Sequence, residues 1–206
     1  MTSKRKPSNR DVTVGVAESG PSAVLVTASS VGELLDRREV RLTEPGLSTH
    51  PHHHEGSWAV GRYLDSPWAR KVTLAEALAL VERVRASAER GARAQLAVLE
   101  EELGVRITRI ALRACPELPP TPAECIADAR AQTYADSVMY RRALALAAEE
   151  RGARIAWYDE QRVARAAAEA LGSAEFEERL RAFGRRVGPP WQARHKLAAA
   201  AALAAR

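Results

Sequence analysis

Four of the five histidines of the chain stand in segment 50–55, which reads His-Pro-His-His-His-Glu. Neutral imidazole is a common ligand of Zn²⁺, Ni²⁺ and Cu²⁺. Because successive side chains of an extended chain alternate in direction, we expect His52 and His54 to share a side. The segment matches no standard zinc motif. It predicts either a zinc or nickel site or a polar loop that binds metal adventitiously. The candidate ligands are His50, His52, His54 and Glu55.

Two glutamates follow segments of strand type, and a fifth histidine stands near the C-terminus. Glu18 comes directly after segment 13–17, Glu117 comes shortly after segment 105–114, and His195 stands between Arg194 and Lys196. Carboxylate oxygens suit Mg²⁺ or Mn²⁺, which could activate a water and stabilise the leaving oxygen of a phosphodiester. The alternative is that both glutamates lie in solvated turns and His195 lies on the surface.

Aromatic and basic residues are interleaved beyond the histidines. Bases stack on aromatic rings while cations pair with phosphates, although such rings also pack loops onto a core. The candidates for nucleic-acid contact are Arg62, Trp68, Arg70, Lys71, Arg194 and Lys196. Segment 128–142 is also polar, and either lines a cleft or forms ion pairs on a solvated helix face.

Composition limits the function classes. The chain has 206 residues, a net charge of +5 and 46% hydrophobic residues, so one hydrophobic core and an anionic partner such as DNA or RNA are reasonable expectations. No apolar run is long enough to span a membrane, and the basic start lacks the apolar segment of a secretory signal, which favours a cytoplasmic location. Cys115 and Cys125 match no zinc or redox spacing and are expected to be reduced thiols. Glycine-rich nucleotide loops and a hydrolase nucleophile elbow are absent.

Periodicity predicts the elements that must position these residues. Alternating or β-branched runs predict strands at 13–17, 23–28, 38–42, 105–114 and 153–158. Capping boxes at Thr73–Glu76 and Thr121–Glu124 open helices that end near Gly104 and Gly152, with a possible break near Gly91. Three further helical stretches are expected at 160–171, 173–183 and 190–206. A long histidine-rich loop is expected at 43–71.

This order predicts an α/β fold. The first three strands are expected to form an antiparallel meander, and each later strand returns after a helix and so joins in parallel by a right-handed crossover. The result is a mixed five-stranded sheet flanked by helices. We expect a disordered basic tail at 1–11, which could also act as a phosphate-seeking arm, and a single domain at 12–206.

The element order and the placement of acidic residues resemble the ribonuclease H-like superfamily, which includes the Holliday-junction resolvases. Segment 14–18, Val-Gly-Val-Ala-Glu, resembles the first-strand motif; Glu117 follows the fourth strand; and His195 precedes an alanine-rich last helix. The resemblance implies a metal-dependent nuclease in which Glu18 and Glu117 hold Mg²⁺ or Mn²⁺ and His195 assists. The superfamily nearly always has Asp on the first strand, whereas this chain has Ala17 or Glu18 there. The sequence also resembles an uncharacterised bacterial protein family.

Three hypotheses therefore stand. The first is a metal-dependent phosphodiesterase acting on nucleic acid. The second is a catalytically degenerate ribonuclease H-like domain that serves as a binding or interaction module. The third is a metal-binding protein that uses the histidine loop.

Overall fold

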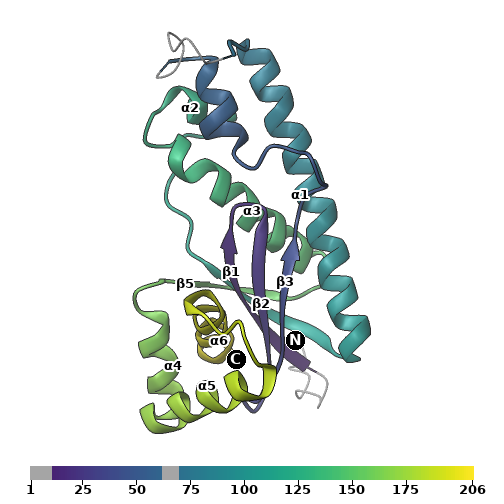
Figure 1. Cartoon of the computed structure of the whole chain (residues 1–206), viewed down its shortest axis with the longest axis vertical. Helices are drawn as coiled ribbons and strands as arrows, with labels where there is room; N and C mark the ends of the chain where they lie inside the picture. Colours follow the sequence, from purple (N-terminus) through teal and green to yellow (C-terminus); the bar gives the residue numbers. More distant parts are fainter. Residues whose placement is uncertain (1–10, 62–69) are drawn as a thin grey trace, which may run out of the picture.

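The computed structural model describes residues 11–61 and 70–206, and its strands form one sheet of order β3-β2-β1-β4-β5. The strands are β1 (Asp11–Ser19), β2 (Ser22–Ser29), β3 (Leu34–Arg41), β4 (Arg106–Arg113) and β5 (Arg154–Tyr158). Strands β1, β2 and β3 pair antiparallel, whereas β4 joins β1 and β5 joins β4 in parallel. The predicted mixed sheet is confirmed (Figure 1). The predicted tail lies outside the described residues except Asp11, which begins β1.

Strand β1 lies at the centre of this sheet and is buried along eight of its nine residues. Helices cover both faces of the sheet, so the strand reads as a nearly continuous apolar run rather than a strict alternation. Val12, Val14 and Val16 pack into the core on one face, and Ala17 packs into the core on the other. The carboxyl ends of β1 and β4 are therefore held between two helical layers.

The first face is covered by α1 (Leu74–Leu103) and α3 (Gln132–Glu149), with the short α2 (Pro122–Ala127) between them in sequence. Both predicted capping boxes are present, at Thr73–Glu76 and at Thr121–Glu124. Helix α1 continues through Gly91, where a break had been a possibility. A Cβ at this position would lie 1.9 Å from the carbonyl oxygen of Leu42, so the glycine allows the helix to approach the chain beyond β3 closely.

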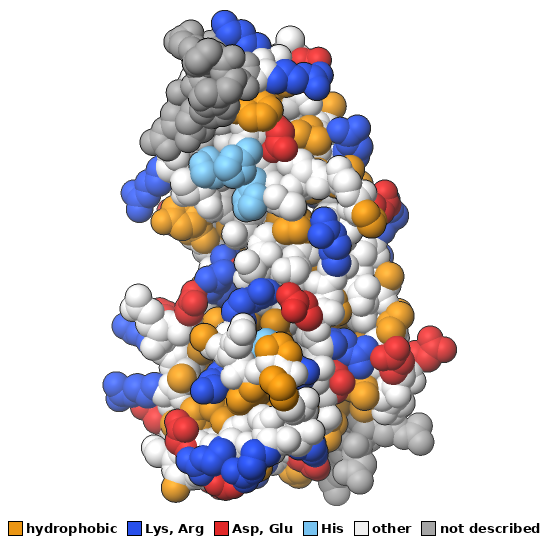
Figure 2. Space-filling view, viewed as in Figure 1, with side chains coloured by type: hydrophobic (Ala, Val, Ile, Leu, Met, Phe, Trp, Pro, Cys, Tyr) orange, Lys and Arg blue, Asp and Glu red, His pale blue; other side chains and the backbone are white. Residues whose placement is uncertain are grey.

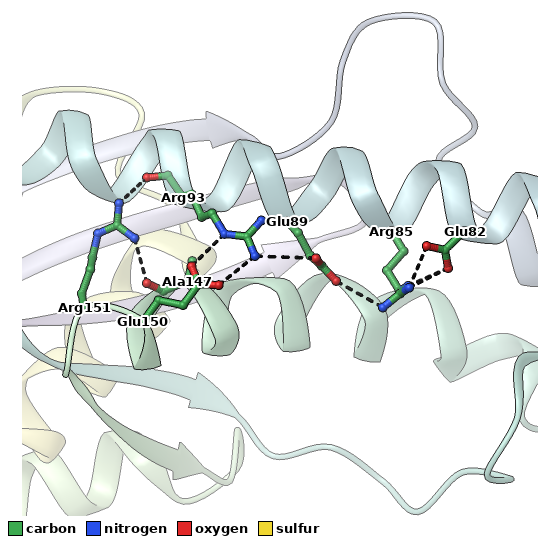
Figure 3. A network of polar contacts seen from close by, with 7 residues as sticks. All are labelled: Glu82, Arg85, Glu89, Arg93, Ala147, Glu150 and Arg151. Carbon is green, nitrogen blue, oxygen red and sulfur yellow. Dashed lines mark hydrogen bonds and ion pairs between the residues drawn. The ribbon is translucent and has the colours of Figure 1, made fainter.

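A row of polar contacts runs along α1 and joins it to the end of α3 (Figure 3). Arg93 donates to the Glu150 carboxylate at 2.7 and 2.8 Å, and Arg151 donates to the carbonyl oxygen of Arg93 at 2.6 Å. These side chains are half-exposed, so each pair contributes little to stability. No helix in the described part of the chain, α1 included, has the length and apolar character to cross a membrane.

The second face is covered by α4 (Val163–Leu171), α5 (Ser173–Val187) and α6 (Ala193–Ala205). Helix α6 lies against β1 and β2 through a buried run of alanines at 198–202. Small side chains allow the helix backbone to come close to the strand. Gly15 completes this contact, because a Cβ there would lie 2.0 Å from the carbonyl oxygen of Ala198. This packing brings the first turn of α6 to the end of β1.

We predict that Gly15→Ala destabilises the protein by about 3 kcal/mol or more, because the added methyl group must displace the α6 backbone. Chemical denaturation followed by circular dichroism measures the change. Gly20→Ala is the control, since nothing lies within 4 Å of its Cβ and only its φ of +56° opposes the substitution. That variant should lose about 1 kcal/mol. Equal losses in the two variants would contradict the packing argument.

Candidate functional site

The Glu18 carboxylate, near the carboxyl end of β1, is buried between two guanidinium groups. Its Oε1 atom accepts a hydrogen bond from Nη2 of Arg113 at 2.5 Å and another from Nε of Arg141 at 2.6 Å. Arg113 is the last residue of β4, and Arg141 lies on α3. The Glu18 side chain is 1% exposed and the Arg141 side chain is 6% exposed. The ion pair therefore lies inside the protein, where the sheet meets α3.

Both arginines make further contacts that fix this arrangement. Arg113 also donates through Nη1 to Glu160 at 2.5 Å, and Arg141 donates through Nη1 to the carbonyl oxygen of Ala114 at 2.9 Å. Burial acts to lower the pKa of Arg113, but its bonds with Glu18 and then with Glu160 raise that pKa above the ordinary value. Arg113 thus stays charged and links the buried carboxylate to the surface.

A third arginine reaches the same end of β1 from α6. Nη2 of Arg194 lies 3.4 Å from the carbonyl oxygen of Ala17, and its Nη1 lies 3.8 Å from Glu39. We call Arg113, Arg141 and Arg194 the arginine cluster. Three buried atoms in and beside it have no hydrogen-bond partner in the described part of the chain, namely Oε2 of Glu18, Nε of Arg113 and Nε of Arg194. Buried polar atoms are nearly always paired, so such orphans mark a place where a ligand, ion or water belongs.

The other members of the expected magnesium or manganese site lie elsewhere or have other partners. Glu117 is exposed in the segment after β4. His195 is buried in the first turn of α6, where its Nδ1 accepts the backbone N–H of Gln192 at 3.1 Å. Burial, and after it the charge of Arg37, lowers the pKa of His195, so the ring is neutral at pH 7.

These residues do not fit the predicted divalent cation. Over residues 11–61 and 70–206, no group of three or more His, Cys, Asp or Glu side chains is arranged to hold a metal ion. Glu18 does lie at the expected edge of the sheet, but its carboxylate faces guanidinium groups. A divalent cation there would have to displace the arginines from Glu18 and would lie beside their positive charges.

The histidine segment forms a helical turn, η1 (Pro51–Glu55), rather than an extended loop. His52 is buried and pairs through Nδ1 with Oδ1 of Asp136 at 2.8 Å, whereas His54 is exposed. The expectation that these two histidines share a side is therefore wrong. The backbone N–H groups of His52 and His53 also bond to Asp136, at 3.0 and 3.2 Å, and these bonds turn the chain inward.

The remaining histidine rings pack on one another. The ring centroids of His50 and His54 are 5.2 Å apart, and those of His53 and His54 are 4.8 Å apart. Figure 2 shows the histidine group on the upper part of the visible face. The outline of the molecule is indented between that part and the lower helices. Charged side chains gather beside the indentation, level with the end of β1 in Figure 1. The Zn²⁺ or Ni²⁺ site predicted on this segment, with Glu55, stays a prediction.

The described candidates for nucleic-acid contact lie in different regions of the structure. Arg62 and Trp68 lie outside the described residues. Arg70 and Lys71 are exposed ahead of α1, and Lys196 is exposed on α6. Arg194 alone among the described candidates lies at the carboxyl edge of the sheet.

Sequence reasoning missed Arg113, and it included Arg141 and Asp136 only as members of a polar segment without assigning their partners. Arg141 and Asp136 belong to the polar segment 128–142, whose charge was visible inside a helical pattern. Arg113 gave a weaker signal, since it is one of three arginines in β4. Their partners could not be identified without the fold.

The comparisons with known proteins bear on the fold. The chain matches the solved structure of T. thermophilus RuvC in complex with a Holliday junction substrate, with a TM-score of 0.51 and 13% sequence identity over 94% of this chain and 90% of that one. A second Thermus thermophilus RuvC structure matches with a TM-score of 0.47 and 13% identity, over 94% and 92% of the two chains. No protein-family model and no curated protein matches the chain. The first likeness shows that the chain has a ribonuclease H-like fold.

We predict that Glu18→Gln destabilises the protein by about 3 kcal/mol at pH 7, because it leaves the buried Arg141 without a counter-charge. Glu160→Gln removes the exposed partner of Arg113 and should cost less than about 1 kcal/mol. Urea denaturation of both variants at one salt concentration gives the comparison. A Glu18→Gln variant as stable as the wild type would mean that the carboxylate is not held by the arginines.

Proposed function

We propose that this chain is a ribonuclease H-like domain that binds nucleic acid through the arginine cluster and does not cleave it by a metal-dependent reaction. The observation that carries the proposal is the pairing of the buried Glu18 carboxylate with Arg113 and Arg141. The related fold of T. thermophilus RuvC, solved in complex with a Holliday junction substrate, supports nucleic acid as the class of partner. The proposal corresponds to the catalytically degenerate binding module among the three hypotheses.

The exposed carboxylates beside the cluster can be exchanged for an anion. One buried carboxylate lies among three guanidinium groups, and the two outer carboxylates, Glu160 and Glu39, are more than half exposed. An approaching phosphate can replace these outer carboxylates without uncovering Glu18. Guanidinium groups bind phosphate oxygens through paired N–H donors, which gives both charge and geometry.

Arg194 is the cluster member best placed for such a contact. Its side chain is 38% exposed, and its ion pair with Glu39 is long, at 3.8 Å. Its weak partners cost little to exchange for a phosphate. Arg141, by contrast, is buried against Glu18 and serves to hold the carboxylate. We therefore assign phosphate contact to Arg194 first and to Arg113 second.

Metal-dependent cleavage requires carboxylates that clamp cations beside the attacking and leaving oxygens. Of the expected triad, Glu18 is the carboxylate at the sheet edge, and it is paired there with Arg113 and Arg141. A metal ion that displaced the arginines from Glu18 would leave their guanidinium groups without a counter-charge inside the protein, which would cost several kcal/mol. We therefore propose binding rather than hydrolysis.

We predict that Arg194→Gln weakens binding of a fluorescently labelled four-way DNA junction and lowers the slope of log affinity against log salt by about 0.9, the value of one phosphate contact. Fluorescence anisotropy over a series of salt concentrations measures both quantities. A linear duplex and a single strand of equal length show whether branching matters. Arg165→Gln is the matched control, because its side chain is 84% exposed on α4 and pairs with Glu169 alone among the residues that the structure describes.

Two outcomes would contradict the proposal. One is equal affinity and salt slope in the Arg194 and Arg165 variants. The other is cleavage of any of these nucleic acids with Mg²⁺ or Mn²⁺ that is lost in Glu117→Gln. Glu117 is exposed, so this variant keeps the fold and a loss of cleavage would report on chemistry.

A further inference from the structure

A small pocket lies beside α3 and contains no member of the arginine cluster in its lining. Its volume is about 290 Å³, close to the lower end for sites that hold small molecules. Helices α1 and α3 and the segment that leads into α2 form its walls. Much of this wall is apolar. Its apolar lining includes Pro119, Pro120, Pro122, Val138, Met139 and Leu146.

His52 gives this wall a fixed polar group. Its Nδ1 lies 2.8 Å from Oδ1 of Asp136, and the pair is almost completely buried. Asp136 also accepts the backbone N–H groups of His52 and His53, so its carboxylate acts as acceptor for all three contacts. Nδ1 therefore carries the hydrogen. The other ring nitrogen, Nε2, takes no part in the pair, and the residue lines the pocket.

The charged residues of the wall leave one positive charge unbalanced. Arg85 is paired with Glu82 at 2.6 Å and with Glu89 at 3.4 Å, and Glu89 also lies 3.8 Å from Arg93 (Figure 3). Arg142 also lines the pocket and is exposed. Among the residues that the structure describes, its side chain has neither an ion pair nor a hydrogen bond. The pocket thus combines apolar walls with a single available guanidinium group.

We propose that this pocket binds a small monocarboxylate with an apolar body, such as an aromatic or branched-chain acid. Arg142 pairs with the carboxylate, and the prolines, Met139 and Leu146 cover the apolar body. This arrangement of mostly apolar lining with a few placed polar groups is the usual form of a small-molecule site. The proposal is independent of nucleic-acid binding, because it uses no member of the arginine cluster.

Methionine NMR gives a direct test, because the chain contains two methionines, Met1 and Met139. Protein labelled with ¹³C at the methionine methyl groups is titrated with benzoate, phenylacetate and 3-methylbutanoate. Benzyl alcohol and benzylamine serve as neutral and cationic counterparts of similar size. We expect a saturable shift of the Met139 signal with at least one carboxylate and a much weaker response to the alcohol and the amine.

Two variants distinguish the contribution of the Arg142 charge to binding from that of the apolar cavity. Arg142→Gln should weaken carboxylate binding about tenfold and leave the weak response to benzyl alcohol unchanged. Arg154→Gln removes another exposed arginine, at the start of β5, and should have no effect. The proposal is overturned if no carboxylate shifts the Met139 signal at about 10 mM, if the alcohol binds as well as the acids, or if the two arginine variants behave alike. Nucleic-acid binding measured on the same samples shows whether the two proposals fail separately.

Discussion

The burial of one carboxylate at the end of β1 constrains the rest of this protein. Glu18 cannot remain charged inside the protein without partners, because desolvation of an ion costs several kcal/mol. Arg113 from β4 and Arg141 from α3 supply the opposite charge. The same three residues join the first strand, the parallel strand beside it and the helix over the sheet. The ion pairs that neutralise the buried carboxylate therefore also connect the two strands to the helix.

The position of Glu18 and its arginine partners in the sheet bears on the function of the protein. In open α/β sheets, ligands bind outside the carboxyl ends of the strands, and Glu18 and Arg113 both lie at such ends. In this chain the edge carries guanidinium groups, and the partner that we propose for it is an anion. A fold supports many activities, and the side chains of the site decide which of them a given chain performs.

Local chemistry made much of the fold predictable. The mixed sheet of antiparallel and then parallel strands followed from alternation and the crossover rule, and the starts of α1 and α2 followed from two capping boxes. Contacts over long sequence distances were not predictable. Glu18 lies 95 residues from Arg113 and 123 residues from Arg141, so a carboxylate that looked available for metal is paired in the folded chain.

The histidine segment is a second case in which a contact distant in sequence was not predictable. His52 and His54 would share a side in an extended chain, but hydrogen bonds to Asp136, more than 80 residues away, hold the segment in a helical turn. One tertiary acceptor thereby separates the two imidazoles and turns His52 into part of a pocket wall. The polar segment 128–142 supplies that acceptor together with Arg141 and Arg142, so it contributes to both candidate sites.

A crystal structure of the protein with a short branched oligonucleotide and Mn²⁺, recorded with anomalous data, tests the central claim most directly. The account predicts backbone phosphate oxygens at the guanidinium group of Arg194, an intact Glu18–Arg141 pair and no anomalous peak at Glu18. A manganese ion bound to the Glu18 carboxylate, with Arg113 and Arg141 turned away from it, would contradict the account.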